Sequence, residues 1–230
     1  MKNSEKILYG LVITILIYIL SVIGGHLTKS LTDNFVLAYM MVPLIDFVLS
    51  AIAIYGFVSK GILEFRLHGD KLKSFVLPVI ITLAATFLTG ALIRILLTLG
   101  GFNNPEQTHV SFMTPVQILF YIFLLGSIAE EMLFRGFLQN MLAPLKDLGI
   151  WPFKMRLSLP IIISALLFGF AHFSLLNGLN SLPNIFRIVM NAIVMGLIAG
   201  YYQEKHNNFL YAAVVHMSSN FPIVIIAFLT

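Results

Sequence analysis

Seven long runs of apolar residues follow one another along this chain, separated by short segments that hold most of the charged residues. Each run approaches the roughly 20 residues that a helix needs to cross a bilayer. Strands of a membrane barrel would be about ten residues long and would alternate in polarity, and these runs do neither. The pattern therefore predicts an all-α, polytopic transmembrane helical bundle. The expected spans are residues 7–27, 35–58, 75–99, 115–140, 159–176, 183–203 and 209–229, and a split or re-entrant segment would add an eighth.

Composition supports a membrane protein, because 59% of the 230 residues are hydrophobic and only 10% are charged. Soluble globular domains carry about 25% charged residues. The first apolar run follows a short basic start without a small-residue cleavage site, which predicts a retained span rather than a cleaved signal. No repeat or linker divides the chain, so we expect a single integral membrane domain over residues 1–230. The absence of cysteine excludes disulfides, cysteine nucleophiles and thiolate metal sites.

The basic residues are distributed unequally between the two ends of the predicted bundle. With the N terminus placed in the cytoplasm, the inner segments hold Lys2, Lys6, Lys60, Arg66, Lys71, Lys73, Lys146, Lys154, Arg156 and Lys205, and the outer loops hold only Lys29. Basic residues stay on the cytoplasmic side of short loops, so this asymmetry predicts a cytoplasmic N terminus. It also accounts for the net charge of +4 without a nucleic-acid partner.

Three ionisable residues, Glu130, Glu131 and Arg135, lie inside the fourth apolar run. A charged side chain at the bilayer centre costs roughly 2.5 to 3.5 kcal/mol on insertion scales, so such residues usually line a polar cavity. Glu131 and Arg135 are four residues apart and share a helix face, where they can pair. Glu130 is rotated by about 100° from Glu131 and faces a different neighbour. The two carboxylates are therefore predicted to have different tasks.

Further polar residues occur in the fifth and seventh runs. His172 follows Phe168 by one helical turn, so the ring of Phe168 can pack against the imidazole. His216 and Asn220 are also one turn apart and are predicted to share a face. With about 1.5 Å of rise per residue, Glu130 and both histidines come out at similar depths, near the midplane. We therefore expect these side chains to form one site.

This set of side chains predicts hydrolysis of a peptide bond by an activated water. Glu130 would act as the general base, and His172 would orient the same water. His216 and Asn220 would donate hydrogen bonds to the oxyanion that forms during attack. The same residues leave a metal mechanism open, in which Glu130, His172 and His216 would bind zinc with one water position.

Other polar or small residues favour structural roles. Asp46 in the second span and Arg94 near the outer end of the third are predicted to form a structural ion pair. The Gly196 and Gly200 spacing in the sixth span predicts close helix packing. Pro222 is expected to kink the seventh span.

Three motifs are thus present in order, each in its own apolar run: EExxxR at residues 130–135, FxxxH at 168–172 and HxxxN at 216–220. Together they resemble the CPBP family, the CAAX-protease and bacteriocin-processing intramembrane proteases also called Abi. The resemblance covers roughly residues 115–229, the expected catalytic core. It implies a glutamate-type intramembrane endopeptidase without a cofactor, with zinc as the alternative, whose site opens to the cytoplasm.

The resemblance assigns Glu130 as base, His172 as its partner on the water, and His216 with Asn220 as the oxyanion site, supported by Glu131, Arg135 and Phe168. It implies membrane-associated peptides or proteins as substrates, and the short chain, rich in Ile, Leu, Phe, Lys and Asn, favours a bacterial member in the plasma membrane. Bacteriocin immunity, peptide maturation and processing of signalling peptides are the expected processes, whereas eukaryotic relatives trim prenylated CAAX proteins.

Two non-proteolytic functions compete with this prediction. A non-catalytic immunity factor or scaffold would keep the same fold without hydrolysis. A transporter would use Glu130, Glu131 and Asp46 as proton sites, but inverted repeats are not evident and Asn220 would carry no proton. Loss of peptide cleavage on substitution of Glu130 would separate the protease from both.

Overall fold

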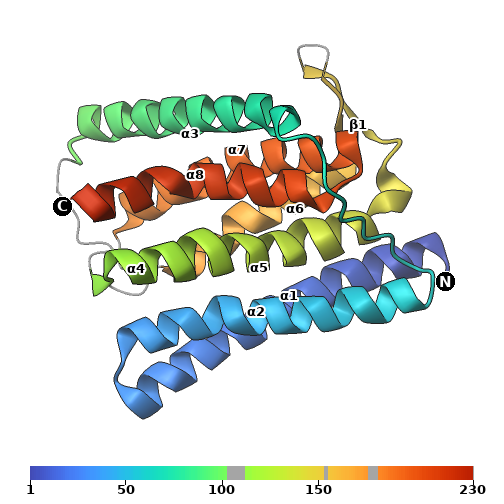
Figure 1. The fold of residues 1–230 in the computed structure, drawn as a ribbon, viewed down its shortest axis with the longest axis horizontal. Helices are drawn as coiled ribbons and strands as arrows, with labels where there is room; N and C mark the ends of the chain where they lie inside the picture. The colour runs from blue at the N-terminus through green and yellow to red at the C-terminus, as the bar shows by residue number, and fades with distance from the viewer. Residues whose placement is uncertain (103–111, 153–154, 176–180, 230) are drawn as a thin grey trace.

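A computed structural model describes residues 1–102, 112–152, 155–175 and 181–229 of the protein. The chain runs back and forth as a bundle of long helices, and Figure 1 places the N and C termini at opposite ends. We call these the N-terminal end and the C-terminal end of the bundle. The all-α fold class predicted from the apolar runs is confirmed.

The long helices closely follow the predicted spans. They are α1 (Asn3–Thr32), α2 (Phe35–Ser59), α3 (Lys73–Leu99), α7 (Leu182–His206) and α8 (Phe209–Leu229). The fourth span, Pro115–Gln139, is continuous but changes its helical winding along its length. Its parts are α4 (Pro115–Gln117), η2 (Ile118–Gly126), α5 (Ser127–Glu131) and η3 (Met132–Gln139).

The fifth predicted span is shorter than a full crossing. Residues Leu159–Ala171 form α6, and a 3₁₀ turn, η6, continues over His172–Leu175. The expected end at residue 176 lies outside the described residues. Thirteen α-helical residues rise only about 20 Å, less than the roughly 30 Å of a hydrocarbon core. Among the described residues, six helices are long and apolar enough to cross a membrane, and the Leu159–Leu175 segment is a shorter apolar helix. The chain is thus an integral membrane protein.

Local sequence signals account for the helix ends. Thr114 caps the fourth span, and Pro115 stands at its first turn, where a missing N–H costs nothing. The turn between α1 and α2 passes through Asp33 in a left-handed conformation, and the turn between α7 and α8 passes through Asn207 in the same way. Asp and Asn tolerate this conformation better than other non-glycine residues.

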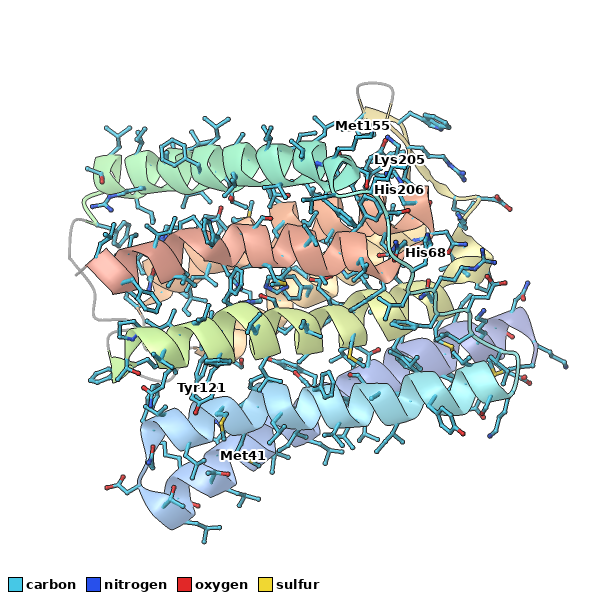
Figure 2. The ribbon with its side chains drawn as sticks, viewed as in Figure 1. Met41, His68, Tyr121, Met155, Lys205 and His206 are labelled. Carbon is cyan, nitrogen blue, oxygen red and sulfur yellow. The ribbon has the colours of Figure 1, made fainter. Side chains whose placement is uncertain are left out.

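The end of the fourth span is deeply buried, with seven of the eight residues of Met132–Gln139 inside the bundle. The span contacts α1, α2, α6 and α8. Its apolar side chains form much of the core, and the fully buried ones are Ala129, Leu133, Phe137 and Leu138. Large apolar side chains on the outer helices instead point away from the bundle, as Figure 2 shows. The polar residues of the fourth span are therefore held on the most constrained helix.

Two local features were not predicted. The stretches Ile118–Gly126 and Met132–Gln139 are wound as π-helix, on either side of the α-helical turn Ser127–Glu131. A short antiparallel hairpin pairs β1 (Gly149–Ile150) with β2 (Leu157–Ser158) at the N-terminal end. Short π-helical segments occur frequently at functional sites, and here they flank both glutamates.

Candidate active site

The glutamates sit where the fourth span changes its winding. At the preceding π stretch, a Cβ on Gly126 would lie 2.9 Å from the carbonyl oxygen of Tyr121, so only glycine fits this close approach. After the glutamates, the side-chain amide of Gln203 in α7 donates to the backbone carbonyl of Arg135 at 2.8 Å. Backbone groups released by irregular winding need such partners inside a membrane.

Glu131 and Arg135 form the predicted brace along the helix. Arg135 Nη1 donates to Glu131 Oε1 at 2.8 Å, and both side chains are completely buried. The guanidinium also lies over the ring of Phe168, with its carbon 4.6 Å from the ring centroid. A buried charge is tolerated when a partner of opposite charge is held in good geometry. The predicted pairing of these two residues is confirmed.

The two glycines of α7 make room for polar side chains of the fourth span. A Cβ on Gly196 would lie 2.4 Å from Arg135 Nη2, and one on Gly200 would lie 2.7 Å from Gln139 Oε1. Gln139 Nε2 in turn donates to the carbonyl oxygen of Gly200 at 3.1 Å. The predicted packing role is confirmed, and its reason is the space that Arg135 and Gln139 occupy.

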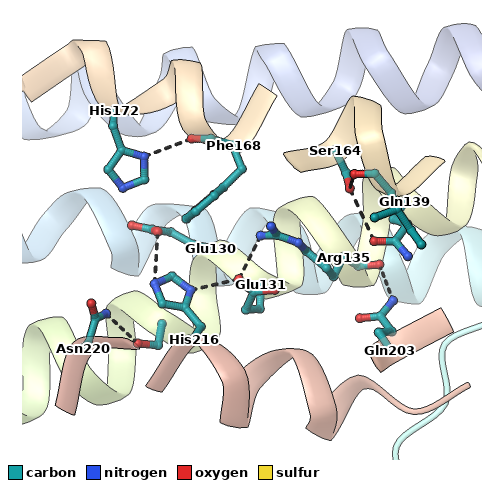
Figure 3. A network of polar contacts seen from close by, with 12 residues as sticks. Glu130, Glu131, Arg135, Gln139, Ser164, Phe168, His172, Gln203, His216 and Asn220 are labelled. Atoms are coloured by element: carbon teal, nitrogen blue, oxygen red, sulfur yellow. Dashed lines mark hydrogen bonds and ion pairs between the residues drawn. The ribbon is translucent and has the colours of Figure 1, made fainter. Parts of the chain in front are cut away.

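His216 lies between the two carboxylates, a position that the sequence did not predict. Its Nδ1 is 2.9 Å from Glu131 Oε1, and its Nε2 is 3.8 Å from Glu130 Oε2. Because a carboxylate only accepts, Nδ1 carries the proton toward Glu131. Figure 3 shows the resulting chain from Arg135 through Glu131 and His216 to Glu130. The buried pair thus holds a histidine, which in turn faces the second glutamate.

His172 terminates α6 beside the same cluster. Its Nδ1 is 2.9 Å from the carbonyl oxygen of Phe168, which can only accept. Nδ1 therefore donates, and Nε2 carries the lone pair in the neutral ring. In Figure 3 the imidazole and the Glu130 carboxylate point toward one another. The Phe168 ring contacts both histidines edge-on, with centroids 4.8 Å from His172 and 5.5 Å from His216. The predicted aromatic wall is confirmed.

Asn220 contacts a different residue from His216, although both belong to α8. Its amide nitrogen donates to Ser127 Oγ at 3.0 Å, and this hydroxyl donates to the carbonyl of Ile122 at 3.3 Å. One N–H of Asn220 is thus taken by Ser127, a partner that the sequence did not predict, and the joint oxyanion role of His216 and Asn220 stays a prediction. Helix spacing predicts a shared face but not the partners that the neighbouring span supplies. Ser127 thereby contacts a residue of the candidate site.

A cavity of about 1990 Å³ joins the candidate residues. Glu130, Phe168, His172, His216 and Asn220 all line it, whereas Glu131 and Arg135 do not. The Glu130 side chain is 32% exposed, and that of Glu131 is not exposed at all. The four predicted catalytic residues therefore face one shared space, with the brace behind them.

Residues 112–222 match the model of a protein family described as type II CAAX prenyl endopeptidase Rce1-like. Over these residues, the predicted resemblance to the CAAX protease family is confirmed. The matched segment covers the fourth span, α6 and α7 and most of α8, and thus includes every residue of the three motifs. No curated protein and no solved structure shows a significant match to the chain.

The predicted ion pair between Asp46 and Arg94 is wrong. Asp46 is buried in α2 and accepts a hydrogen bond from Ser21 Oγ at 2.5 Å. Arg94 is exposed, and within the described residues it makes no ion pair with Asp46. Both line the cavity, but at different depths. The hydroxyl of Ser21 in α1 supplies a hydrogen bond to the buried carboxyl group of Asp46, in place of the predicted ion pair.

The cavity reaches the C-terminal end of the bundle. Its lining there includes Lys29, Phe35, Thr98, Phe102 and Pro115. The N terminus lies at the other end of the bundle. We expected both the N terminus and the opening of the site on the cytoplasmic side, and the two expectations together are therefore wrong. The rise per residue predicts how deep each side chain lies in the membrane, but it does not predict at which end of the bundle the helices separate to open the cavity.

The zinc alternative fits the described residues poorly. Among them, no three His, Asp or Glu side chains are gathered in a group that could hold a metal ion. In the proposed set, Nδ1 of His216 is held by Glu131 and Nδ1 of His172 by the carbonyl of Phe168, so each histidine could offer a metal only its Nε2. Because the described side chains are not gathered around one point, we derive no step through a metal.

Proposed function

We propose that this protein is an intramembrane endopeptidase of the CAAX protease type that hydrolyses peptide bonds with a water activated by Glu130. The observation that carries the proposal is the contrast between its two glutamates: Glu131 is fully buried against Arg135, and Glu130 is partly exposed in the cavity. A general base must reach its water and still lie in a low-dielectric surrounding, and Glu130 meets both conditions.

In the proposed reaction, a water between Glu130 and His172 attacks the carbonyl carbon of the scissile bond. Glu130 accepts one proton from the water as the new carbon–oxygen bond forms. The neutral Nε2 of His172 accepts a hydrogen bond from the same water and fixes its direction. As the carbon–nitrogen bond breaks, the proton passes from Glu130 to the leaving amine. The products are a carboxylic acid and an amine; the acid passes its proton to the amine, which leaves a carboxylate and an ammonium group, and the base is regenerated.

The oxyanion of the tetrahedral intermediate needs hydrogen-bond donors near the cavity wall. The amide of Asn220 has two N–H groups, of which one donates to Ser127. We assign the second to the oxyanion. His216, when protonated on both nitrogens, donates Nδ1–H to Glu131 and presents Nε2–H beside Glu130. One such donor typically contributes about 10² to 10³ in kcat.

Substrate class remains part of the proposal. The matched family is described as a prenyl endopeptidase, and the apolar bundle suits a peptide held at the membrane. We propose membrane-associated peptides or proteins of a bacterium as substrates, in bacteriocin immunity, peptide maturation or signalling-peptide processing. The cavity is wide enough to accept an extended peptide together with its water.

The test is peptide cleavage by the purified protein in lipid nanodiscs, with products identified by mass spectrometry. Glu130→Ala, His172→Ala and His216→Ala should each abolish cleavage, and a zinc chelator should leave the parent protein active. Chelator-sensitive cleavage that zinc restores would replace the glutamate mechanism with the metal one. Cleavage that survives in Glu130→Ala would overturn both, and a parent without activity against a broad peptide library would favour the non-catalytic scaffold.

A further inference from the structure

The cavity beside Glu130 connects to one end of the bundle and not to the other. Toward the C-terminal end its lining includes the last residues of α1 and α3 and the first residues of α2, α4 and α7. None of the described loop residues at the N-terminal end lines it. In Figure 2, Tyr121, a lining residue, lies toward the C-terminal end, whereas Lys205 lies at the N-terminal end.

The distribution of basic residues indicates which side of the membrane each end of the bundle faces. Nine of the described Lys and Arg residues belong to segments at the N-terminal end, and Arg135 is buried in the fourth span. Of the other described ones, only Lys29, Arg94 and Arg187 remain for the C-terminal end. Since basic residues collect in cytoplasmic loops, the N-terminal end faces the cytoplasm and the cavity opens to the outer side.

All three of these outer basic residues line the cavity. Lys29 and Arg94 are exposed, and neither takes part in an ion pair within the described residues. Arg187 Nη2 donates to Asn184 Oδ1 at 2.7 Å, which fixes its guanidinium near the start of α7. The acidic residues that share the lining, Asp46 and Glu130, lie deep in the cavity. The mouth of the cavity is therefore basic, on the side where basic residues are otherwise scarce.

We propose that this basic mouth, formed by Lys29, Arg94 and Arg187, binds carboxylate side chains of a peptide substrate that enters from the outer side of the membrane. The inference rests on the proposed function and narrows its substrate class to peptides with an acidic segment next to the apolar segment that is cut. A low-dielectric cleft lined by one sign of charge concentrates ligands of the opposite sign.

Basic residues near a membrane surface also attract anionic lipid headgroups, so lipid phosphate is the rival ligand. The lining favours the peptide, because the three side chains border the same cavity as Glu130. Basic side chains that only extend toward lipid headgroups could lie anywhere on the outer surface of the helices and would not need to border this cavity.

A binding experiment tests the mouth independently of catalysis. Two fluorescent peptides with the same apolar core, one carrying three Glu and the other three Gln, are titrated by anisotropy against Glu130→Gln protein in phosphatidylcholine nanodiscs. We expect the acidic peptide to bind on the order of tenfold more tightly at low salt, because each exposed charge pair contributes a small gain in affinity and the gains add up. Adding Lys29→Gln and Arg94→Gln should abolish the preference, and Lys60→Gln with Lys205→Gln, a charge-matched control, should preserve it.

Three results would overturn the proposal. One is equal binding of the two peptides, and another is a preference that survives in the mouth variant. The third is that anionic lipid co-purifies with the parent but not with the mouth variant, and that neither peptide is preferred. This result would make lipid headgroups the ligand of the mouth. A protein that prefers the acidic peptide but cleaves nothing would instead contradict the proposed function alone.

The direction of entry has its own test, made simple by the absence of native cysteine. Lys29→Cys and Lys205→Cys are treated in intact bacterial cells with a membrane-impermeant maleimide. Lys29→Cys should be labelled in intact cells and Lys205→Cys only after permeabilisation. The opposite pattern would place the mouth in the cytoplasm and overturn entry from outside.

Discussion

Glu130 and Glu131 are neighbours in sequence with opposite surroundings. Glu131 is fully buried, and its Oε1 accepts from Arg135 and His216 together. Glu130 is 32% exposed, lines the cavity, and within the described residues has one ionisable neighbour at ion-pair distance, His216 at 3.8 Å. One step along a helix rotates the side chain by about 100°, and this separates a buried, paired carboxylate from one that faces the cavity. The comparison teaches that Glu131 holds His216 in the position in which it faces Glu130.

The largest expected effect comes from substituting the exposed acid. Glu130→Gln should lower kcat for peptide cleavage by about 10² to 10⁴, the usual contribution of a positioned base. Its effect on stability should stay within about 1 kcal/mol, because the partly exposed side chain forms only one long ion pair. Kinetics in nanodiscs and unfolding in mixed SDS micelles measure the two quantities. Retained activity, or a large loss of stability, would remove the distinction between the two glutamates.

Substitution of the buried acid should instead unfold the protein more easily. Glu131→Gln leaves Arg135 without its counter-charge in the core, which typically costs about 3 to 5 kcal/mol. Unfolding in mixed SDS micelles should therefore begin at a lower SDS fraction than for the parent or for Glu130→Gln. The control is the double variant Glu131→Met with Arg135→Met, which should recover part of the loss. A double variant as unstable as the single one would argue that packing, not charge, is responsible.

The brace and the cavity differed in how well the sequence predicted them. The Glu131 and Arg135 pair follows from a spacing of four within one helix, and its prediction was correct. The contacts of His216 with Glu131 and of Asn220 with Ser127 join residues 85 and 93 positions apart. They depend on how α8 packs against the fourth span, for which spacing within α8 carries no information. The π-helical winding likewise has no periodic signal in so apolar a run.

A smaller effect on stability is expected at Gly196, which packs against Arg135 of the buried ion pair. In Gly196→Ala the new Cβ would lie 2.4 Å from Arg135 Nη2, so the guanidinium must move, at a cost of about 1 to 3 kcal/mol. Gly56→Ala is the matched control in α2, because a Cβ there meets nothing within 4 Å. Alanine should stabilise that position by roughly 0.5 to 1 kcal/mol, since glycine is unfavourable in a helix. Equal effects at both sites would mean that Arg135 is not tightly enclosed.

The smallest expected effect tests whether Ser127 positions Asn220 on the cavity side. Ser127→Ala removes the hydroxyl that accepts from the Asn220 amide, a hydrogen bond worth about 0.5 to 1.5 kcal/mol, so kcat should fall roughly two- to tenfold. KM should change little, and Ser127→Thr, which keeps the hydroxyl, should retain more activity than alanine. In an Asn220→Ala background the Ser127→Ala change should have almost no further effect on kcat, because the two residues act as one unit. Additive losses would show that Ser127 supports the fourth span independently and that the oxyanion assignment of Asn220 does not depend on it.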